Sequence, residues 1–141
     1  MTAGRDAVLL DTSGWLAAVD PRQQHHEQAR DAYRSLLGDR VHLLTTNLLV
    51  AEMHILISKA RGPEAGLAFL DALNADPAHE IVHVDRDLEL DAVDRWMRKH
   101  PQTRLSVADV TAFELAHRRK VKRVLALDAH FRIPRLTLLP G

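Results

Sequence analysis

Four acidic residues of this chain each interrupt or end an apolar segment, where a charged side chain is least expected. They are Asp11, Glu52, Asp109 and Asp128. A buried carboxylate is costly unless a cation compensates its charge. We therefore predict that the four carboxylates share a metal site. Oxygen ligands without cysteine or paired histidine favour a hard ion, Mg²⁺ or Mn²⁺ as its substitute, over Zn²⁺. The chemistry expected of such a site is hydrolysis of a phosphodiester, in which the metal activates a water and stabilises the leaving oxygen.

Three of the four acids also have a structural explanation. Asp11 precedes a predicted helix and can cap its first turn. Asp109 is the fourth residue of a segment that begins at Ser106, which matches a capping box. Asp128 follows a predicted strand and can cap the next turn. Glu52 differs, because it lies inside a predicted helix on the same face as apolar residues, so we expect it to be buried, in the pocket or in a salt bridge with an arginine.

Short apolar runs alternate along the chain with segments of helical periodicity. Strands are predicted over residues 7–11, 41–44, 81–84, 123–127 and 136–139, and helices over residues 12–19, 25–37, 48–59, 64–73, 88–99 and 106–119. This order predicts an α/β fold, a three-layer α/β/α sandwich with a mostly parallel sheet of four to five short strands. Ligands collect at the carboxyl ends of such strands, where Asp11 and Asp128 are expected to lie.

Length and composition limit the classes of protein that the chain can represent. Its 141 residues predict a single domain, residues 1–141. Nineteen basic and nineteen acidic residues balance, so nucleic-acid binding would need a local patch. The absence of cysteine fits a reducing compartment, and no apolar run is long enough for a signal peptide or a membrane span, so we expect a soluble, cytoplasmic protein with no membrane contact.

Taken in order, the acidic motifs resemble those of the PIN-domain ribonucleases, and most closely the VapC toxins of bacterial toxin–antitoxin pairs. The motifs are Leu10-Asp11-Thr12-Ser13, Val50-Ala51-Glu52, Leu105-Ser106-Val107-Ala108-Asp109 with Ala112, and Leu127-Asp128-Ala129-His130-Phe131. The resemblance spans essentially the whole chain. It implies that Asp11 and Asp109 are the principal Mg²⁺ ligands, and that Glu52 and Asp128 complete the pocket. Thr12 or Ser13 would help to position the attacking water or the phosphate.

The same resemblance implies a function and partners. The chain would be a Mg²⁺-dependent endoribonuclease of single-stranded or structured RNA and the toxin of a type II pair. It would form a homodimer, and a small cognate antitoxin would cover its pocket. The chain departs from the family pattern at Ala126, where members often have a Thr or Ser two residues before the last acid. A hydroxyl near the metal is therefore expected to be missing.

Basic and histidine-rich segments are the remaining candidates for function. The basic run 118–123 could hold RNA, but cations also stabilise the end of a helix, and the predicted topology places this run at the opposite edge of the sheet from the acids. Arg104, close to Ser106 in sequence, is the better candidate for a phosphate contact. Nothing in the sequence places His25 or His26 near the acids.

Two other functions fit part of the pattern. A receiver-like signalling domain also gathers acids around Mg²⁺, with Asp85 as its candidate phosphoacceptor, but the first strand carries only one acid and no suitably placed lysine follows a later strand. A catalytically silent PIN-like module used for protein contact would keep the fold without cleaving RNA.

Overall fold

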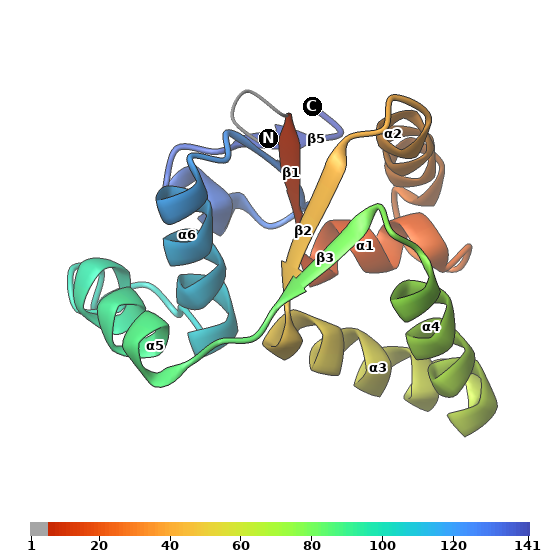
Figure 1. The fold of residues 1–141 in the computed structure, drawn as a ribbon, viewed down its shortest axis with the longest axis horizontal. Helices are drawn as coiled ribbons and strands as arrows, with labels where there is room; N and C mark the ends of the chain where they lie inside the picture. Colours follow the sequence, from red (N-terminus) through yellow and green to blue (C-terminus); the bar gives the residue numbers. More distant parts are fainter. Residues whose placement is uncertain (1–5) are drawn as a thin grey trace.

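The computed structural model describes residues 6–141, and its centre is a five-stranded sheet in which every pair of neighbouring strands is parallel. The strand order is β3-β2-β1-β4-β5 (Figure 1). The strands are β1 (Ala7–Leu10), β2 (His42–Thr46), β3 (His79–Val82), β4 (Arg123–Leu125) and β5 (Thr137–Leu139). The helices are α1 (Thr12–Val19), α2 (His26–Gly38), α3 (Asn47–Arg61), α4 (Pro63–Ala75), α5 (Arg86–Ala92) and α6 (Val107–Arg119), with a π-helical turn η1 (Val93–Met97) and a 3₁₀ turn η2 (Ala129–Arg132). The predicted α/β fold with a parallel sheet is confirmed.

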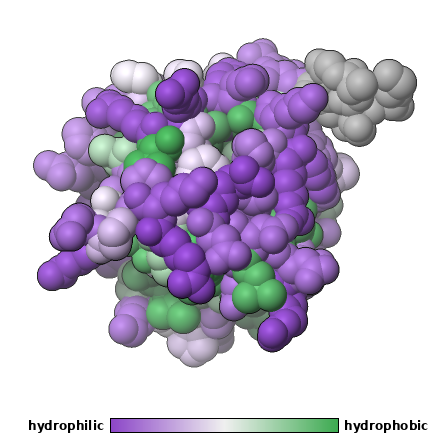
Figure 2. Space-filling view, turned by 90° about the vertical axis from the view of Figure 1, so that its left-hand side faces the viewer, coloured by the Kyte–Doolittle hydropathy of each residue, from purple (hydrophilic) through white to green (hydrophobic). Residues whose placement is uncertain are grey.

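Helices cover both faces of the sheet, as Figure 1 shows, with α5 and α6 on one side and α1, α2 and α4 on the other. Alternate residues of β1 supply the two halves of the core, because successive side chains of a strand point to opposite faces. Leu9 packs on the side of α6, whereas Val8 and Leu10 pack on the side of α1 and α2. Figure 2 shows the outer surface on the side of α5 and α6, where hydrophilic residues dominate and hydrophobic ones form small, separate patches.

The element limits differ from the prediction mainly in the second half of the chain. The helix predicted over 88–99 splits, because α5 passes into the wider turn η1. In that turn Arg95 Nε and Trp96 Nε1 both donate to Glu114 Oε1 of α6, at 2.8 and 3.1 Å. The strand β4 stops at Leu125, two residues before its predicted end, and the turn expected after Asp128 is the 3₁₀ turn η2. Across the described chain, no helix is both long and apolar enough to cross a membrane.

Two arginines of the basic run 118–123 have the structural role that their position at the end of a helix predicted. Arg118 bonds Glu114 and Asp91, and Arg119 bonds both carboxylate oxygens of Glu80. These cations therefore tie the end of α6 to neighbouring elements.

Candidate metal centre

All four predicted acids line one pocket of about 790 Å³ at the carboxyl edge of the sheet. Asp11 follows β1 directly, and Asp128 lies three residues after the end of β4, the neighbouring strand. Helix α6 brings Asp109 in its first turn, and α3 brings Glu52. The structure thus brings together the residues that the sequence singled out.

Asp11 is the most deeply placed of these acids, with 4% of its surface exposed. Its Oδ2 accepts hydrogen bonds from the backbone N–H and the hydroxyl of Ser13, at 3.1 and 2.6 Å. The pKa of Asp11 is raised to about 6, chiefly by burial and also by the nearby Asp109 and Asp128 carboxylates, while the hydrogen bonds from Ser13 act in the opposite direction. A cation in the pocket would hold the Asp11 carboxylate in its charged form.

Capping and pocket formation turn out to be compatible at all three aspartates. Asp109 forms a capping box, since its Oδ2 accepts from the Ser106 backbone N–H and the Ser106 hydroxyl accepts from the Asp109 N–H, both at 3.0 Å. Asp128 Oδ1 accepts from the backbone N–H of His130 at 2.9 Å. In each aspartate, one carboxylate oxygen accepts the capping hydrogen bond. Within residues 6–141 the other oxygen accepts no hydrogen bond; it is Oδ1 in Asp11 and Asp109 and Oδ2 in Asp128.

Glu52 lines the pocket but is exposed, so the expectation that it is buried on an apolar face is wrong. Helix α3 is apolar on two faces, and only one of them, with Leu49 and Met53, packs into the core. Glu52 lies on the other face with Ile55, which is 52% exposed. Its Oε1 accepts a hydrogen bond of 2.6 Å from the Thr12 hydroxyl.

These residues fit a hard divalent cation. Asp11, Asp109 and Asp128 all line the pocket, and within residues 6–141 each has a carboxylate oxygen that accepts no hydrogen bond. Oxygen is the ligand that Mg²⁺ and Mn²⁺ prefer. Ligand atoms of Asp109, Asp128 and His130 all lie within 4.8 Å of one another. The amino-terminal ends of α1 and α6 also point their partial positive charge at this region. A cation together with these helix ends would offset the repulsion among the acids.

Both hydroxyls named from the sequence contact the acids themselves. The Ser13 hydroxyl, which donates to Asp11, also accepts from the backbone N–H groups of Leu127 and Asp128, at 2.9 and 3.2 Å. One hydroxyl thus joins the carboxylate after β1 to the loop after β4, beside Ala126, which has no hydroxyl of its own. Ser13 positions two acids, and Thr12 positions Glu52.

Replacing Ser13 with Ala should weaken metal binding without unfolding the protein. The variant loses the donor to Asp11 and the acceptor for the loop that carries Asp128. We expect the Kd for Mn²⁺, measured by calorimetry, to rise about 10-fold or more, as is typical when a residue that orients metal ligands is removed. The matched control is Ser35→Ala on the exposed side of α2. Equal Mn²⁺ affinity in the two variants would contradict this role for Ser13.

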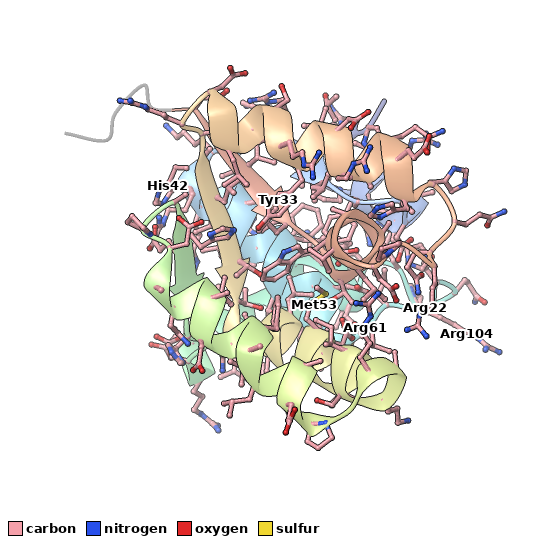
Figure 3. All side chains as sticks on the ribbon, turned by 90° about the vertical axis from the view of Figure 1, so that its right-hand side faces the viewer. Arg22, Tyr33, His42, Met53, Arg61 and Arg104 are labelled. Carbon is pink, nitrogen blue, oxygen red and sulfur yellow. The ribbon has the colours of Figure 1, made fainter. Side chains whose placement is uncertain are left out.

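Two histidines lie in or beside the pocket. The sequence placed His130 in the same motif as Asp128, but it did not place His25 near the acids. His130 Nδ1 is buried 3.4 Å from Asp128 Oδ1. His25 lines the pocket together with Gln23 and Gln24. The only sequence signal for the position of these three residues was Pro21. This proline follows α1 and forces a turn, but it does not show which way the chain turns. Arg104 is exposed, does not line the pocket and projects outward in Figure 3, so its phosphate contact stays a prediction.

An acidic pocket at the carboxyl edge of a parallel sheet is typical of metal-dependent enzymes that act on phosphate esters. The family model of the PIN domain matches residues 8–135. The chain therefore belongs to the PIN domain family, as its motifs predicted.

Among curated proteins, the chain is 29% identical over 125 residues to Ribonuclease VapC26 of Mycobacterium tuberculosis, which covers 88% of this chain and 89% of that protein. Among solved structures, it is similar to VapC20 of Mycobacterium tuberculosis, a sarcin-ricin loop cleaving toxin, with a TM-score of 0.79 and 23% identity over 93% of this chain and 97% of that one. It is also similar to VapBC2 of Rickettsia felis bound to a DNA fragment from its promoter, with a TM-score of 0.68 and 17% identity over 94% and 96% of the two chains. These structural similarities show a shared fold.

The structure disfavours the receiver-like alternative. Asp85 follows β3, which is an edge strand, and its side chain caps α5 by accepting from the Leu88 N–H at 2.8 Å. It does not line the acidic pocket.

Proposed function

We propose that this protein is a Mg²⁺-dependent endoribonuclease and the toxin of a type II toxin–antitoxin pair. One observation carries the proposal: three aspartates line one pocket of a PIN fold, and each has a carboxylate oxygen that accepts no hydrogen bond from the part of the chain that the structure describes. The similarity to Ribonuclease VapC26 over most of both chains supports RNA as the substrate.

In this proposal Asp11 and Asp109 are the principal metal ligands, and Asp128 and Glu52 complete the pocket. Bound Mg²⁺, for which Mn²⁺ can substitute, activates a water molecule and stabilises the leaving oxygen of the phosphodiester. Ser13 keeps Asp11 and Asp128 at a fixed separation. Arg104, which is exposed near the amino-terminal end of α6, contacts a phosphate of the RNA strand.

The pocket also has features suited to a protein partner. Ile55 and Leu56 are 52% and 38% exposed on its wall, which is unusual for large apolar side chains beside a polar site. We propose that a small cognate antitoxin covers this wall and blocks RNA, and that the toxin is a cytoplasmic homodimer. The similarity to VapBC2 supports the antitoxin partner.

The direct test is cleavage of single-stranded and hairpin RNA by the purified protein. Cleavage should require Mg²⁺ or Mn²⁺, stop on addition of EDTA and return when the metal is restored. Asp109→Asn should be inactive, whereas Asp71→Asn, a matched change at an exposed position of α4, should cleave like the wild type. Cleavage that survives exhaustive chelation would overturn the proposal.

Calorimetry with Mn²⁺ distinguishes the nuclease from a catalytically silent PIN-like module. The nuclease should bind Mn²⁺ in a manner that Asp109→Asn weakens and Asp71→Asn does not. A silent module would show no binding that depends on the pocket carboxylates.

A further inference from the structure

The pocket extends beyond the acids to a second wall of different chemistry. This wall consists of Leu16 from α1, Ile55 and Leu56 from α3, and Gln23, Gln24 and His25 from the turn between α1 and α2. The whole pocket measures about 790 Å³, which is more than cations and one phosphate occupy and lies within the roughly 300–1,000 Å³ typical of sites for small organic ligands. The second wall therefore has room for a further group of the substrate.

The turn that carries this wall is held by a network around Asp20. The Asp20 carboxylate is 8% exposed and accepts from the backbone N–H of Arg22 at 3.0 Å. The Arg22 and Arg61 side chains, which lie close together in Figure 3, both contact Asp20 Oδ1, at 3.3 and 3.5 Å. The ring Nδ1 of His26 lies 2.7 Å from the carbonyl oxygen of Ala17 and ties the turn to α1. The backbone of the turn is thus fixed from both sides.

His25 has a backbone conformation that is rare for a residue with a side chain. Its φ of 63° lies in the left-handed region, where non-glycine residues are uncommon and which recurs at functional sites. Its carbonyl accepts from the Ala29 N–H at 3.0 Å and so begins α2. Within residues 6–141, the side chains of His25 and Gln24 make no hydrogen bond that would occupy them. Both remain available to a ligand in the pocket.

An apolar surface flanked by an amide and an imidazole has the chemistry that recognises a nucleobase. Proteins read single-stranded RNA by packing unstacked bases against side chains, including histidine, and by hydrogen bonding to the base edges. A glutamine amide offers a donor and an acceptor side by side and can therefore distinguish one base edge from another. The wall carries no lysine or arginine, so a phosphate is a poor match for it.

We propose that Gln24, His25 and Ile55 form a base-binding subsite that selects a nucleotide next to the cleaved phosphodiester. The inference rests on the proposed ribonuclease function and adds the source of its sequence preference. Ile55 lies one helical turn from Glu52 on α3, so a base against Ile55 belongs to a nucleotide beside the acids. The wall then determines which RNA is cut, and the acids cut it.

The test is the cleavage preference of the full-length protein on a random pool of single-stranded RNA, read by sequencing the cleaved ends. The wild type should show a preference at one position beside the cut. In Gln24→Ala and His25→Ala that preference should fall about 10-fold, the size expected for one lost base contact. The kcat/KM should fall on the preferred sequence and stay constant on a disfavoured one, while the Kd for Mn²⁺ stays unchanged. Gln28→Ala, a matched change outside the pocket, should keep the wild-type preference.

Several results would overturn the inference while the ribonuclease function survives. One is cleavage by the wild type without any base preference, and another is that the variants keep the wild-type preference. A third is that the variants lose only affinity for the antitoxin, which would show that the wall binds the protein partner and not a base. If the wild type cleaves no RNA with Mg²⁺ or Mn²⁺, the proposed function fails and the subsite fails with it.

Discussion

Replacing Asp11 with Asn is expected to abolish RNA cleavage and, at neutral pH, to make the metal-free protein more stable. The amide keeps an oxygen for the backbone N–H of Ser13, so the cap of α1 survives. It cannot supply the negative charge that a divalent cation requires. We expect cleavage to fall by roughly 10³-fold or more, the order of effect of removing one strong electrostatic group from an active site.

The gain in stability follows from the raised pKa of Asp11, which is about 6 instead of the ordinary 3.8. Between these two values the folded protein binds a proton that the unfolded chain has released, so the stability of the metal-free protein falls as the pH rises through this window. Above pH 6 the cost is fully present and amounts to about 3 kcal/mol. Asn carries no such cost, so Asp11→Asn should be more stable than the wild type at pH 7 and nearly equal to it at pH 4.

Urea unfolding in EDTA at both pH values measures this effect, with Asp71→Asn as the control at an exposed position. If Asp11→Asn were no more stable than the wild type at pH 7, burial of a charged Asp11 would not be costly. Excess Mg²⁺ should reduce the difference, because it stabilises only the wild type.

Gly14→Ala should strongly destabilise the protein. A Cβ atom at this position would lie 2.5 Å from the backbone N of Ala126 and from the carbonyl C and O of Leu125. The first turn of α1 therefore packs directly against β4, and backbone atoms of a central strand cannot move aside. We expect a loss of about 3 kcal/mol or more in the free energy of unfolding.

Gly38→Ala is the matched control, because a Cβ there meets nothing within 4 Å. Gly38 is the last residue of α2, so alanine should be neutral or stabilise by up to about 1 kcal/mol. Thermal and urea unfolding of both variants and of the wild type measure these changes in stability. A Gly14→Ala protein that unfolds at the wild-type temperature would show that α1 can shift away from β4.

The sequence was sufficient to predict the gathering of the four acids, because this depends on topology. Alternating strands and helices give a parallel sheet, and Asp11 and Asp128 follow neighbouring strands of it. The acids on α3 and α6 then reach the same edge. These conclusions need only the order of the elements.

The degree of burial of each acid could not be predicted in the same way. Glu52 was expected to be buried and is exposed, whereas Asp11, with its simple explanation as a cap, is almost fully buried. Glu114 shows the physical reason. It lies in an apolar segment like the site acids and is only 2% exposed, yet it is compensated by Arg95 and Arg118. Arg95 comes from another element, η1, and the sequence alone does not show which arginine pairs with which carboxylate.

The wall that includes His25 was missed for a related reason. The direction of the turn after α1 depends on contacts of Asp20 with Arg22 and Arg61, and Arg61 is distant in sequence. Local propensity predicts that the chain turns after α1 but not which way it turns.

The double duty of the three aspartates shapes how this protein can lose its activity. Asparagine caps a helix about as well as aspartate, and Asp11 and Asp128 are both N-cap residues. A single-base change from an aspartate codon to an asparagine codon at either position should therefore leave a chain that folds but, under the proposed mechanism, does not cleave RNA. Under the proposed toxin function, such a change at Asp11 or Asp128 would let a cell survive expression of this gene. The inactive protein would still fold and still occupy its partner, so a silenced copy would titrate the antitoxin away from an intact one.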